Sequence, residues 1–439
     1  MILIALCLAA VLVTPAPAAA ASTNCWGVLS VTPWDQPPRP ATLADTLADG
    51  LVVRAYWDSL ETDQGAFRWS YLDQVFAAAG SKRIHLIVAP GFYSPPAVIA
   101  ASHTASFLVP DGPLAGQLAP LPLPWDSTYL HHWFRFVDSL AVRYGHQPSL
   151  AYVSLAGPNA YNGEMALPTD SAGVTTWRAV AGSDTTLARL LEQAWRQTID
   201  AYDAAFAGSG ASFTIALVPN SLPLGDSTLQ AHYEDDIIAY GLSHAPNRFG
   251  IQTNGLDGRP YCPEQPPKYH WPVIAQYSTV TLTGFQTMDP AELYACARRD
   301  STLYQAVQNA IAYDAHFVEI YEQNVLDPSL AWVIAFAHQR LTNCGPAAVG
   351  EPPPGTLALR AAPNPSRAGT VIRYTLPSRA NVDLGIYDLT GARVATLAQA
   401  QQSRGEHAIA LQTRWPDGVY FCRLRVNGRV ALQRLLIVH

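Results

Sequence analysis

Short apolar runs alternate with longer amphipathic segments through the first three quarters of the chain. Eight of the runs are rich in β-branched residues and have the length of strands, whereas the segments between them repeat apolar residues at helical spacing. The predicted strands are residues 26–33, 50–57, 83–90, 150–157, 212–219, 248–255, 279–287 and 316–323. Strand and helix in alternation predict an α/β fold, a (β/α)8 TIM barrel over residues 22–345. An open doubly wound sheet is the alternative, but no glycine-rich phosphate turn follows an early strand.

The pattern changes after the predicted barrel. Residues 346–355 read PAAVGEPPPG, a proline-rich stretch typical of an extended linker. Residues 356–439 carry short runs in which apolar and polar residues alternate, such as VIRYTLP and NVDLGIYDL. Alternation with a period of two and turn residues between the runs predict a C-terminal antiparallel β-sandwich of the Ig-like type.

The first residues have the features of a secretory signal peptide. An apolar run, MILIALCLAAVLV, is followed by a proline-containing break and small residues that suit a cleavage site. The alternative is a membrane anchor, but the run ends before Pro15 and a spanning helix needs roughly 20 apolar residues. We therefore predict a signal peptide at residues 1–21, and a mature exported chain without a transmembrane segment.

Composition narrows the class of partner. Charged residues make up 14% of the chain and hydrophobic residues 49%, which indicates an ordered globular protein. The net charge of −7 offers no basic surface, so nucleic acid and anionic lipid are not expected partners. We find no cofactor motif and no His/Cys cluster with metal-ligand spacing, and therefore predict no cofactor and no metal.

The cysteines suit an exported protein with disulfides. Five remain once the signal peptide is removed, and these are Cys25, Cys262, Cys296, Cys344 and Cys422. An odd number leaves at least one thiol unpaired within the chain. We hypothesise that Cys25 pairs with Cys344 and Cys262 with Cys296, and that Cys422 is a buried free thiol in a strand.

The C-terminal segment carries three recognisable stretches. They are NPS at residues 364–366, IYDLTGARV at 386–394 and DGVYFCRLRVNGRVALQRLLIV at 417–438. With these stretches the segment resembles the type IX secretion sorting domain and its Ig-like relative in the flagellar hook-cap protein. The resemblance implies a secreted or cell-surface protein, with secretion or surface-anchoring machinery as a partner.

If the barrel is correct, function lies on the loops at the C-terminal ends of its strands. The polar and aromatic residues at these ends include Trp57, Tyr93, Asn159, Asn162, Glu164, Asp257, Gln286, Glu319, Tyr321 and Glu322. Trp57 and Tyr93 are candidates for stacking on a pyranose ring, with packing as the alternative. Asn159, Asn162 and Asp257 are candidates for contacts with sugar hydroxyls, although an Asp between glycines is also a common turn former.

Three longer stretches resemble the barrel glycoside hydrolases of the β-galactosidase-like clan. They are AYWDSLETDQGAFRWSYLDQVFAAA at residues 55–79, RIHLIVAPGFYSPP from residue 83, and FRFVDSLAVRYGHQPSLAYVSLAGPNAYNGE at 134–164. The resemblance implies an acid/base carboxylate after the fourth strand, which Glu164 supplies, and a nucleophilic Glu at the end of the seventh strand. The alternative for Glu164 is a loop carboxylate that caps a turn.

The seventh strand departs from that pattern, because it ends with Gln286 and an amide is not a nucleophile. Glu319 and Glu322 are the candidates for the second carboxylate. They lie three residues apart, so an extended strand places them on opposite faces, and Glu319 with Tyr321 is the better candidate for the interior. The alternative for Glu319 is hydrogen bonding within the barrel core.

Two functions follow from these observations. The first is an exported glycoside hydrolase that acts on a poly- or oligosaccharide, with Glu164 as general acid/base. The alternative is a non-catalytic protein on a degenerate glycosidase barrel, which binds carbohydrate or serves as a surface structural or assembly protein. Gln286 motivates this second hypothesis.

Overall fold

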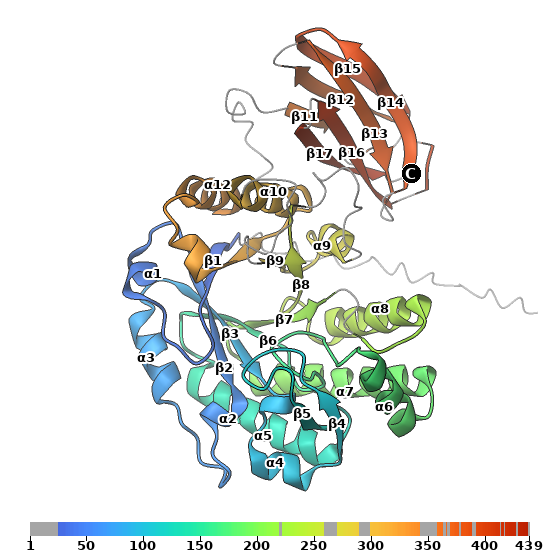
Figure 1. The fold of residues 1–439 in the computed structure, drawn as a ribbon. Helices are drawn as coiled ribbons and strands as arrows, with labels where there is room; N and C mark the ends of the chain where they lie inside the picture. Colours follow the sequence, from blue (N-terminus) through green and yellow to red (C-terminus); the bar gives the residue numbers. More distant parts are fainter. Residues whose placement is uncertain are drawn as a thin grey trace, which may run out of the picture.

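The computed structural model describes residues 25–218, 222–258, 270–288 and 299–342, together with residues 358–437 apart from short gaps. Eight parallel strands close into a barrel (Figure 1). In spatial order they are β1 (Gly27–Val31), β10 (Phe317–Tyr321), β9 (Thr283–Thr287), β8 (Phe249–Leu256), β7 (Ser212–Leu217), β6 (Leu150–Ser154), β3 (Arg83–Ala89) and β2 (Gly50–Tyr56). Each strand overlaps one of the eight predicted runs, so the predicted barrel is confirmed.

The barrel strands bury both of their faces. Leu51, Val53 and Val88 point outward and pack in the layer between the strands and the helices. Val52 and Phe317 point inward and belong to a separate buried cluster inside the barrel. Because both faces are buried, the strands appear in the sequence as nearly continuous apolar runs.

Helices surround the barrel, and short helices lie in its loops (Figure 1). The longer ones are α3 (Ser70–Ala78), α5 (Ser127–Tyr144), α6 (Ser171–Ala181), α7 (Asp184–Ala205), α8 (Ser227–His244), α10 (Arg299–Ala312) and α12 (Ala331–Thr342). The shorter ones are α1 (Pro40–Ala44), α2 (Trp57–Leu60), η1 (Gly91–Tyr93), α4 (Pro96–Ala101), α9 (Trp271–Tyr277) and α11 (Glu322–Val325). Within the part of the chain that the structure describes, we find no helix with the length and apolarity that a membrane span requires.

Helix α5 shows how the sequence fixes a helix and its buried face. The Asp126 carboxylate accepts a hydrogen bond from the Tyr129 backbone N–H (2.9 Å) and so caps the first turn. Leu130, Trp133 and Val137 follow at spacings of three and four residues and are all buried. This spacing places the three side chains on one face, which packs against the barrel.

An antiparallel hairpin is inserted after β3. It consists of β4 (Thr104–Leu108) and β5 (Leu118–Pro122), and its connecting loop contains Asp111. The hydroxyl of Tyr93, at the end of η1, donates a hydrogen bond to the backbone carbonyl of Asp111 (2.6 Å). This contact ties the hairpin loop to the C-terminal end of the third barrel strand.

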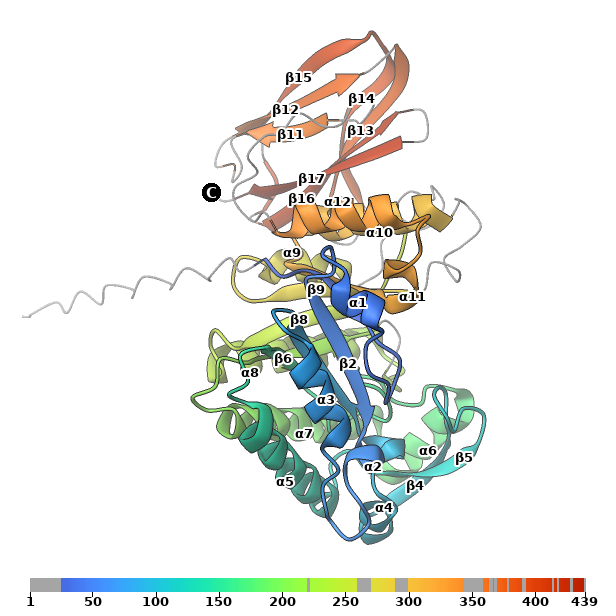
Figure 2. The ribbon, with the colours of Figure 1, turned by 90° about the vertical axis from the view of Figure 1, so that its left-hand side faces the viewer.

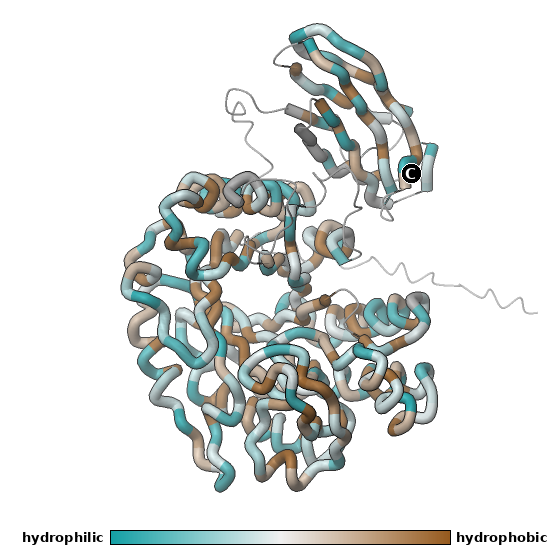
Figure 3. Tube along the Cα trace, in the orientation of Figure 1, coloured by the Kyte–Doolittle hydropathy of each residue, from teal (hydrophilic) through white to brown (hydrophobic). Residues whose placement is uncertain are grey.

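The C-terminal segment forms two antiparallel sheets with a shared core. One sheet contains β11 (Ala358–Ala362), β12 (Gly369–Leu376) and β15 (Gly405–Gln412), and the other contains β14 (Arg393–Gln402), β13 (Ala380–Tyr387), β16 (Gly418–Val426) and β17 (Arg429–Ile437). Ile372 of one sheet and Leu384 and Leu424 of the other belong to one buried cluster. Along these strands hydrophobic and hydrophilic positions alternate, as Figure 3 shows. The predicted antiparallel sandwich is confirmed, and its Ig-like classification stays a prediction.

The sandwich stands beside α10 and α12 of the barrel (Figure 2). The ring of Phe421 on β16 lies 4.8 Å from the ring of Tyr313, which follows α10. Both side chains are buried in the same cluster as the outer barrel layer. An aromatic contact of this kind joins the two parts of the chain.

Several sequence predictions fall outside the described residues. Residues 1–24 and 343–357 hold the predicted signal peptide and linker, which stay predictions. Cys262, Cys296 and Cys344 also lie outside, so neither disulfide pairing is tested. Cys422 is a buried free thiol, as predicted, and burial raises the pKa of this thiol to about 12.

Candidate active site

The loop that carries Glu164 is folded by two asparagines. The Asn159 amide donates to the backbone carbonyls of Tyr161 (3.1 Å) and Asn162 (2.6 Å), and its Oδ1 accepts from the Gly157 N–H (2.8 Å). Asn162 has a φ of 45°, and its Oδ1 accepts from the Glu164 backbone N–H (3.1 Å). Both asparagines, predicted as sugar contacts, therefore shape the loop that positions Glu164.

The same loop is fixed to its neighbours on both sides. The Met165 backbone N–H donates to Ala216 of β7 (2.8 Å), and the Phe92 backbone N–H donates to the carbonyl of Ala160 (2.9 Å). Gly91 lies next to this contact with a φ of +68°, and a Cβ there would collide with the Ala160 carbonyl. Glycine is required at this position for both reasons.

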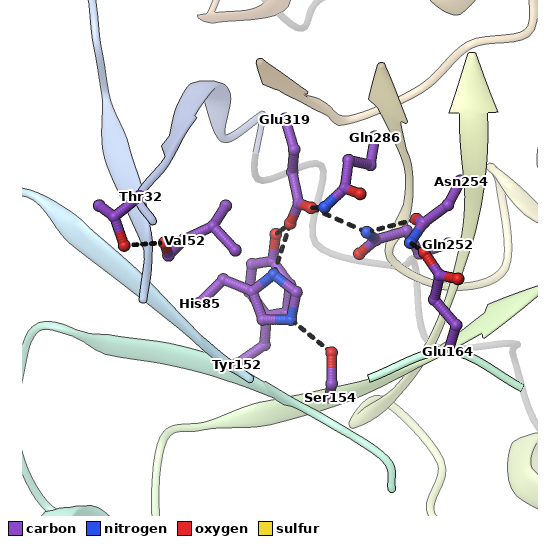
Figure 4. Close-up of polar contacts among 10 residues, drawn as sticks. All are labelled: Thr32, Val52, His85, Tyr152, Ser154, Glu164, Gln252, Asn254, Gln286 and Glu319. Carbon is purple, nitrogen blue, oxygen red and sulfur yellow. Dashed lines mark hydrogen bonds and ion pairs between the residues drawn. The ribbon is translucent and has the colours of Figure 1, made fainter. Parts of the chain in front are cut away.

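Glu164 lies at the C-terminal mouth of the barrel and is partly buried. Its Oε1 accepts a hydrogen bond from the Asn254 amide at the end of β8 (2.6 Å; Figure 4). Burial raises the pKa of Glu164, and the hydrogen bond from Asn254 and the interaction with the Asn162 side chain offset part of that rise. The nearby charge of Asp111 also raises the pKa, while the guanidinium of Arg54 lowers it. Glu164 therefore holds its proton to a higher pH than an exposed glutamate.

Glu319 lies in the centre of the barrel and has no exposed surface. Its Oε1 accepts from the Tyr152 hydroxyl (2.8 Å) and contacts His85 Nδ1, while its Oε2 accepts from the amides of Gln252 (2.9 Å) and Gln286 (3.0 Å; Figure 4). Four partners occupy the four lone-pair positions that a carboxylate offers. Glu319 points inward, as predicted, but presents no unoccupied oxygen to a substrate.

The amides connect the two carboxylates. Besides donating to Glu319, the Gln252 amide nitrogen donates to Asn254 Oδ1 (2.9 Å), and Asn254 donates in turn to Glu164. These residues come from strands β8 and β10 and from the loop after β6, so the network crosses the barrel (Figure 4). Gln252 was not singled out from the sequence, although it lies two residues before Asn254 on one strand and therefore on the same face.

Glu322 lies away from this network. It begins helix α11, where its Oε1 accepts from the Thr42 hydroxyl (2.7 Å) and the Arg39 backbone N–H (2.8 Å). Its Oε2 lies 3.2 Å from the Arg39 guanidinium. The structure therefore does not bring this catalytic candidate to Glu164, because the strand ends at Tyr321 and the side chain binds the segment around α1.

The predicted stacking residues also occupy different places. Trp57 is fully buried, its indole N–H donates to Glu61 (2.9 Å) and its ring packs 4.9 Å from Trp133. Tyr93 is buried against Tyr56, with 4.3 Å between the ring centroids. Neither ring offers a face to solvent, and Trp57 in particular is a packing residue of the outer layer.

Two side chains at the mouth were missed in the sequence. Trp34 is partly buried and stacks on Tyr56 with 4.7 Å between centroids. The guanidinium of Arg54 lies 4.9 Å from the ring centroid of Trp34 and 5.7 Å from that of Tyr321, and its Nε donates to the Thr32 carbonyl (2.7 Å). The position of Trp34 soon after the first strand is the signal that identifies it as a mouth residue.

Asp257, which follows β8, lies beside α10. It is fully buried, and its backbone carbonyl accepts from the Asn309 amide (2.8 Å). The structure therefore places it in the outer layer rather than beside Glu164. No group of three His, Cys, Asp or Glu side chains suited to a metal occurs among the residues described here.

The fold and site define a class of protein, a closed (β/α)8 barrel with a polar centre followed by an antiparallel sandwich. Residues 361–438 match the family model of the secretion system C-terminal sorting domain, which confirms the predicted resemblance of this module. Part of this chain is similar to part of the dimeric latent PorU structure from Porphyromonas gingivalis, at 23% identity over 19% of this chain and 9% of that chain, with a TM-score of 0.17.

Two solved β-galactosidases are similar to the barrel. The enzyme from Rahnella sp. R3 aligns over 73% of this chain and 57% of its own at 12% identity, with a TM-score of 0.46. The enzyme from psychrophilic Marinomonas ef1 aligns over 71% and 59% at 12% identity, with a TM-score of 0.43. This chain therefore spans less than two thirds of the length of either enzyme. A comparison with curated proteins found no significant match.

Proposed function

We propose that the protein is an exported glycoside hydrolase in which Glu164 is the general acid/base. The observation that carries the proposal is the position of Glu164 at the barrel mouth, with its pKa raised by burial. A carboxyl group with a raised pKa keeps its proton to a higher pH, and can donate it to a glycosidic oxygen as the bond breaks. The sorting module supports export to the cell surface or the medium, with the secretion machinery as its partner.

Asn254 supports this role through its hydrogen bond to Glu164 at 2.6 Å. Once the proton has left, the amide stabilises the resulting carboxylate and keeps it in place. The attacking water releases its proton to solvent, and Glu164 regains a proton from solvent before the next turnover. A group that alternates between the two states needs both burial, which favours the acid, and a donor, which favours its anion.

The second partner of the reaction is not Glu319. Direct attack needs an accessible carboxylate oxygen, whereas Glu319 has no exposed surface and four hydrogen-bonding partners. Gln286 is an amide and does not form a glycosyl ester. We therefore propose acid catalysis by Glu164 with water as the attacking group, and no covalent intermediate on Glu319.

A second candidate function is carbohydrate binding without hydrolysis. The saturated state of Glu319 and the amide of Gln286 favour it, because neither residue offers a nucleophile. Trp34 and Arg54 at the mouth are the side chains we propose to contact a sugar in either case. The two functions differ in whether a bound sugar is hydrolysed.

One experiment separates the two functions. Wild type and Glu164→Gln are incubated with a panel of poly- and oligosaccharides, and reducing-end release and binding by calorimetry are measured on the same samples. Hydrolysis predicts release by the wild type and a loss of about 100-fold or more in the variant, with binding retained. Glu322→Gln is the matched control, because this carboxylate lies outside the site. Binding without release supports the second candidate, and neither binding nor release contradicts both.

A further inference from the structure

In the amide network between Glu319 and Glu164, the orientation of each amide group follows from its hydrogen-bonding partners. Oε2 of Glu319 accepts hydrogen bonds from the amide nitrogens of Gln252 and Gln286, and a carboxylate oxygen offers only lone pairs to its partners. Gln252 must therefore turn its NH2 group, and not its carbonyl, toward Glu319. The orientation of this amide follows from the chemistry of its partner.

The same reasoning determines the orientation of the Asn254 amide. The Gln252 amide nitrogen has two hydrogens, and the second donates to Asn254 Oδ1 (2.9 Å). With its Oδ1 engaged in this way, Asn254 turns its own NH2 group toward Glu164 (2.6 Å). In the reverse orientation Asn254 Oδ1 would face Glu164, and the carboxyl group would have to be protonated to bond to it.

We propose that Glu319 is a positioning residue, which through Gln252 fixes the orientation of the Asn254 amide so that Asn254 donates to Glu164. The inference rests on the proposed function for its catalytic meaning, because it assigns the residue that sets how Glu164 is held. It differs from the sequence-based hypothesis, in which Glu319 acts on the substrate directly.

The surroundings of Glu319 hold its carboxylate in place at the start of this series of hydrogen bonds. His85 contacts Glu319 through Nδ1 and Ser154 through Nε2 (2.8 Å), and its ring stacks on Tyr152 at 3.9 Å. All of these groups are buried. By contrast, Oε1 of Gln252 has no hydrogen-bond partner among the described residues, so the contact with Glu319 is what holds this amide in its orientation.

The chain offers a matched pair of variants for the test. Gln252 and Gln286 both donate to Glu319 Oε2, at 2.9 and 3.0 Å, but only Gln252 also donates to Asn254. Gln252→Met and Gln286→Met therefore each remove one donor from Glu319. Only Gln252→Met also interrupts the series of hydrogen bonds that leads to Glu164. The readout is the titration of the Glu164 carboxyl carbon in 13C-glutamate-labelled full-length protein, with the signal assigned by its loss in Glu164→Gln.

We expect Gln252→Met to raise the pKa of Glu164 by roughly one unit, because the released Asn254 amide then turns its oxygen toward the protonated acid. Gln286→Met should leave this pKa within a few tenths of a unit. Equal effects of both variants, or no effect of Gln252→Met, would overturn the proposal.

A measurement on the wild type covers the case in which a variant does not fold. The side-chain 15N signal of Asn254 should shift with pH at the same midpoint as Glu164, because its NH2 group faces that carboxylate. A 15N signal that does not shift as Glu164 titrates contradicts the proposed orientation of Asn254. Neither measurement uses turnover, so a failure of the proposed hydrolysis, seen as full activity of Glu164→Gln, is distinguishable from a failure of this inference.

Discussion

The carboxylate at the mouth of the barrel, Glu164, is partly buried, whereas the carboxylate at its centre, Glu319, is fully buried, and their hydrogen-bonding surroundings differ. Glu164 at the mouth has one side-chain donor on Oε1 and a raised pKa. Glu319 at the centre is surrounded by four partners and has no exposed surface. Burial with few donors raises the pKa of a carboxyl group, whereas a full set of donors stabilises a buried carboxylate. The number of donors, rather than depth alone, distinguishes the two environments.

The largest expected effect is on stability, and it tests the contrast between Glu164 and Glu319. Glu319→Ala leaves the donors of Tyr152, Gln252 and Gln286 buried without a partner. We expect it to lower the free energy of unfolding by about 3–5 kcal/mol. Glu164→Ala, the matched control, should cost about 1 kcal/mol or less, because it removes only one hydrogen bond. Denaturant unfolding followed by tryptophan fluorescence measures both, and equal losses would contradict the distinction.

The next largest effect concerns the loop that positions Glu164. Gly91 and Gly80 both have a positive φ, +68° and +60°, but only Gly91 lies against another backbone, the Ala160 carbonyl. Gly80→Ala should cost about 1 kcal/mol of stability, from the backbone conformation alone. Gly91→Ala should cost more and should also displace the Glu164 loop, with about 10-fold or greater loss of glycan turnover. If Gly80→Ala reduces turnover as much as Gly91→Ala, the loop contact is not the cause.

The smallest expected effect is on the pH dependence of stability. Burial raises the pKa of Glu164 above the ordinary value of 4.5, so the folded state holds a proton that the unfolded state releases. Stability should therefore fall as the pH rises from that ordinary value through the raised one, and then level off. Glu164→Gln should remove this fall. Unfolding midpoints of both proteins across pH 4–9 check it, and parallel curves would show that the pKa of Glu164 is not raised.

The sequence predicted the barrel well because the signal is local. Each strand is a run of apolar residues buried on both faces, as the run of β2 from Gly50 to Tyr56 illustrates. The inward direction of Glu319 also followed from local alternation along its strand. The antiparallel sandwich was predicted from the same kind of evidence, with a period of two.

The site was harder to predict because its contacts are distant in the sequence. Trp57 follows a strand, as a mouth residue would, but it packs on Trp133 of α5. Glu322 also follows a strand, but Arg39 and Thr42, nearly three hundred residues earlier, bind it. A residue type after a strand identifies a candidate, and only its partners across the fold decide its role.

The proton-donor role of Glu164 is tested most directly by the dependence of its effect on the leaving group. The values of kcat/KM of wild type and Glu164→Gln are compared on a natural disaccharide and on the matching dinitrophenyl glycoside, whose leaving group needs no proton. We predict a loss of about 100-fold or more on the disaccharide and a much smaller loss on the activated glycoside. Equal losses on the two substrates, or no loss on the disaccharide, would contradict Glu164 as the proton donor.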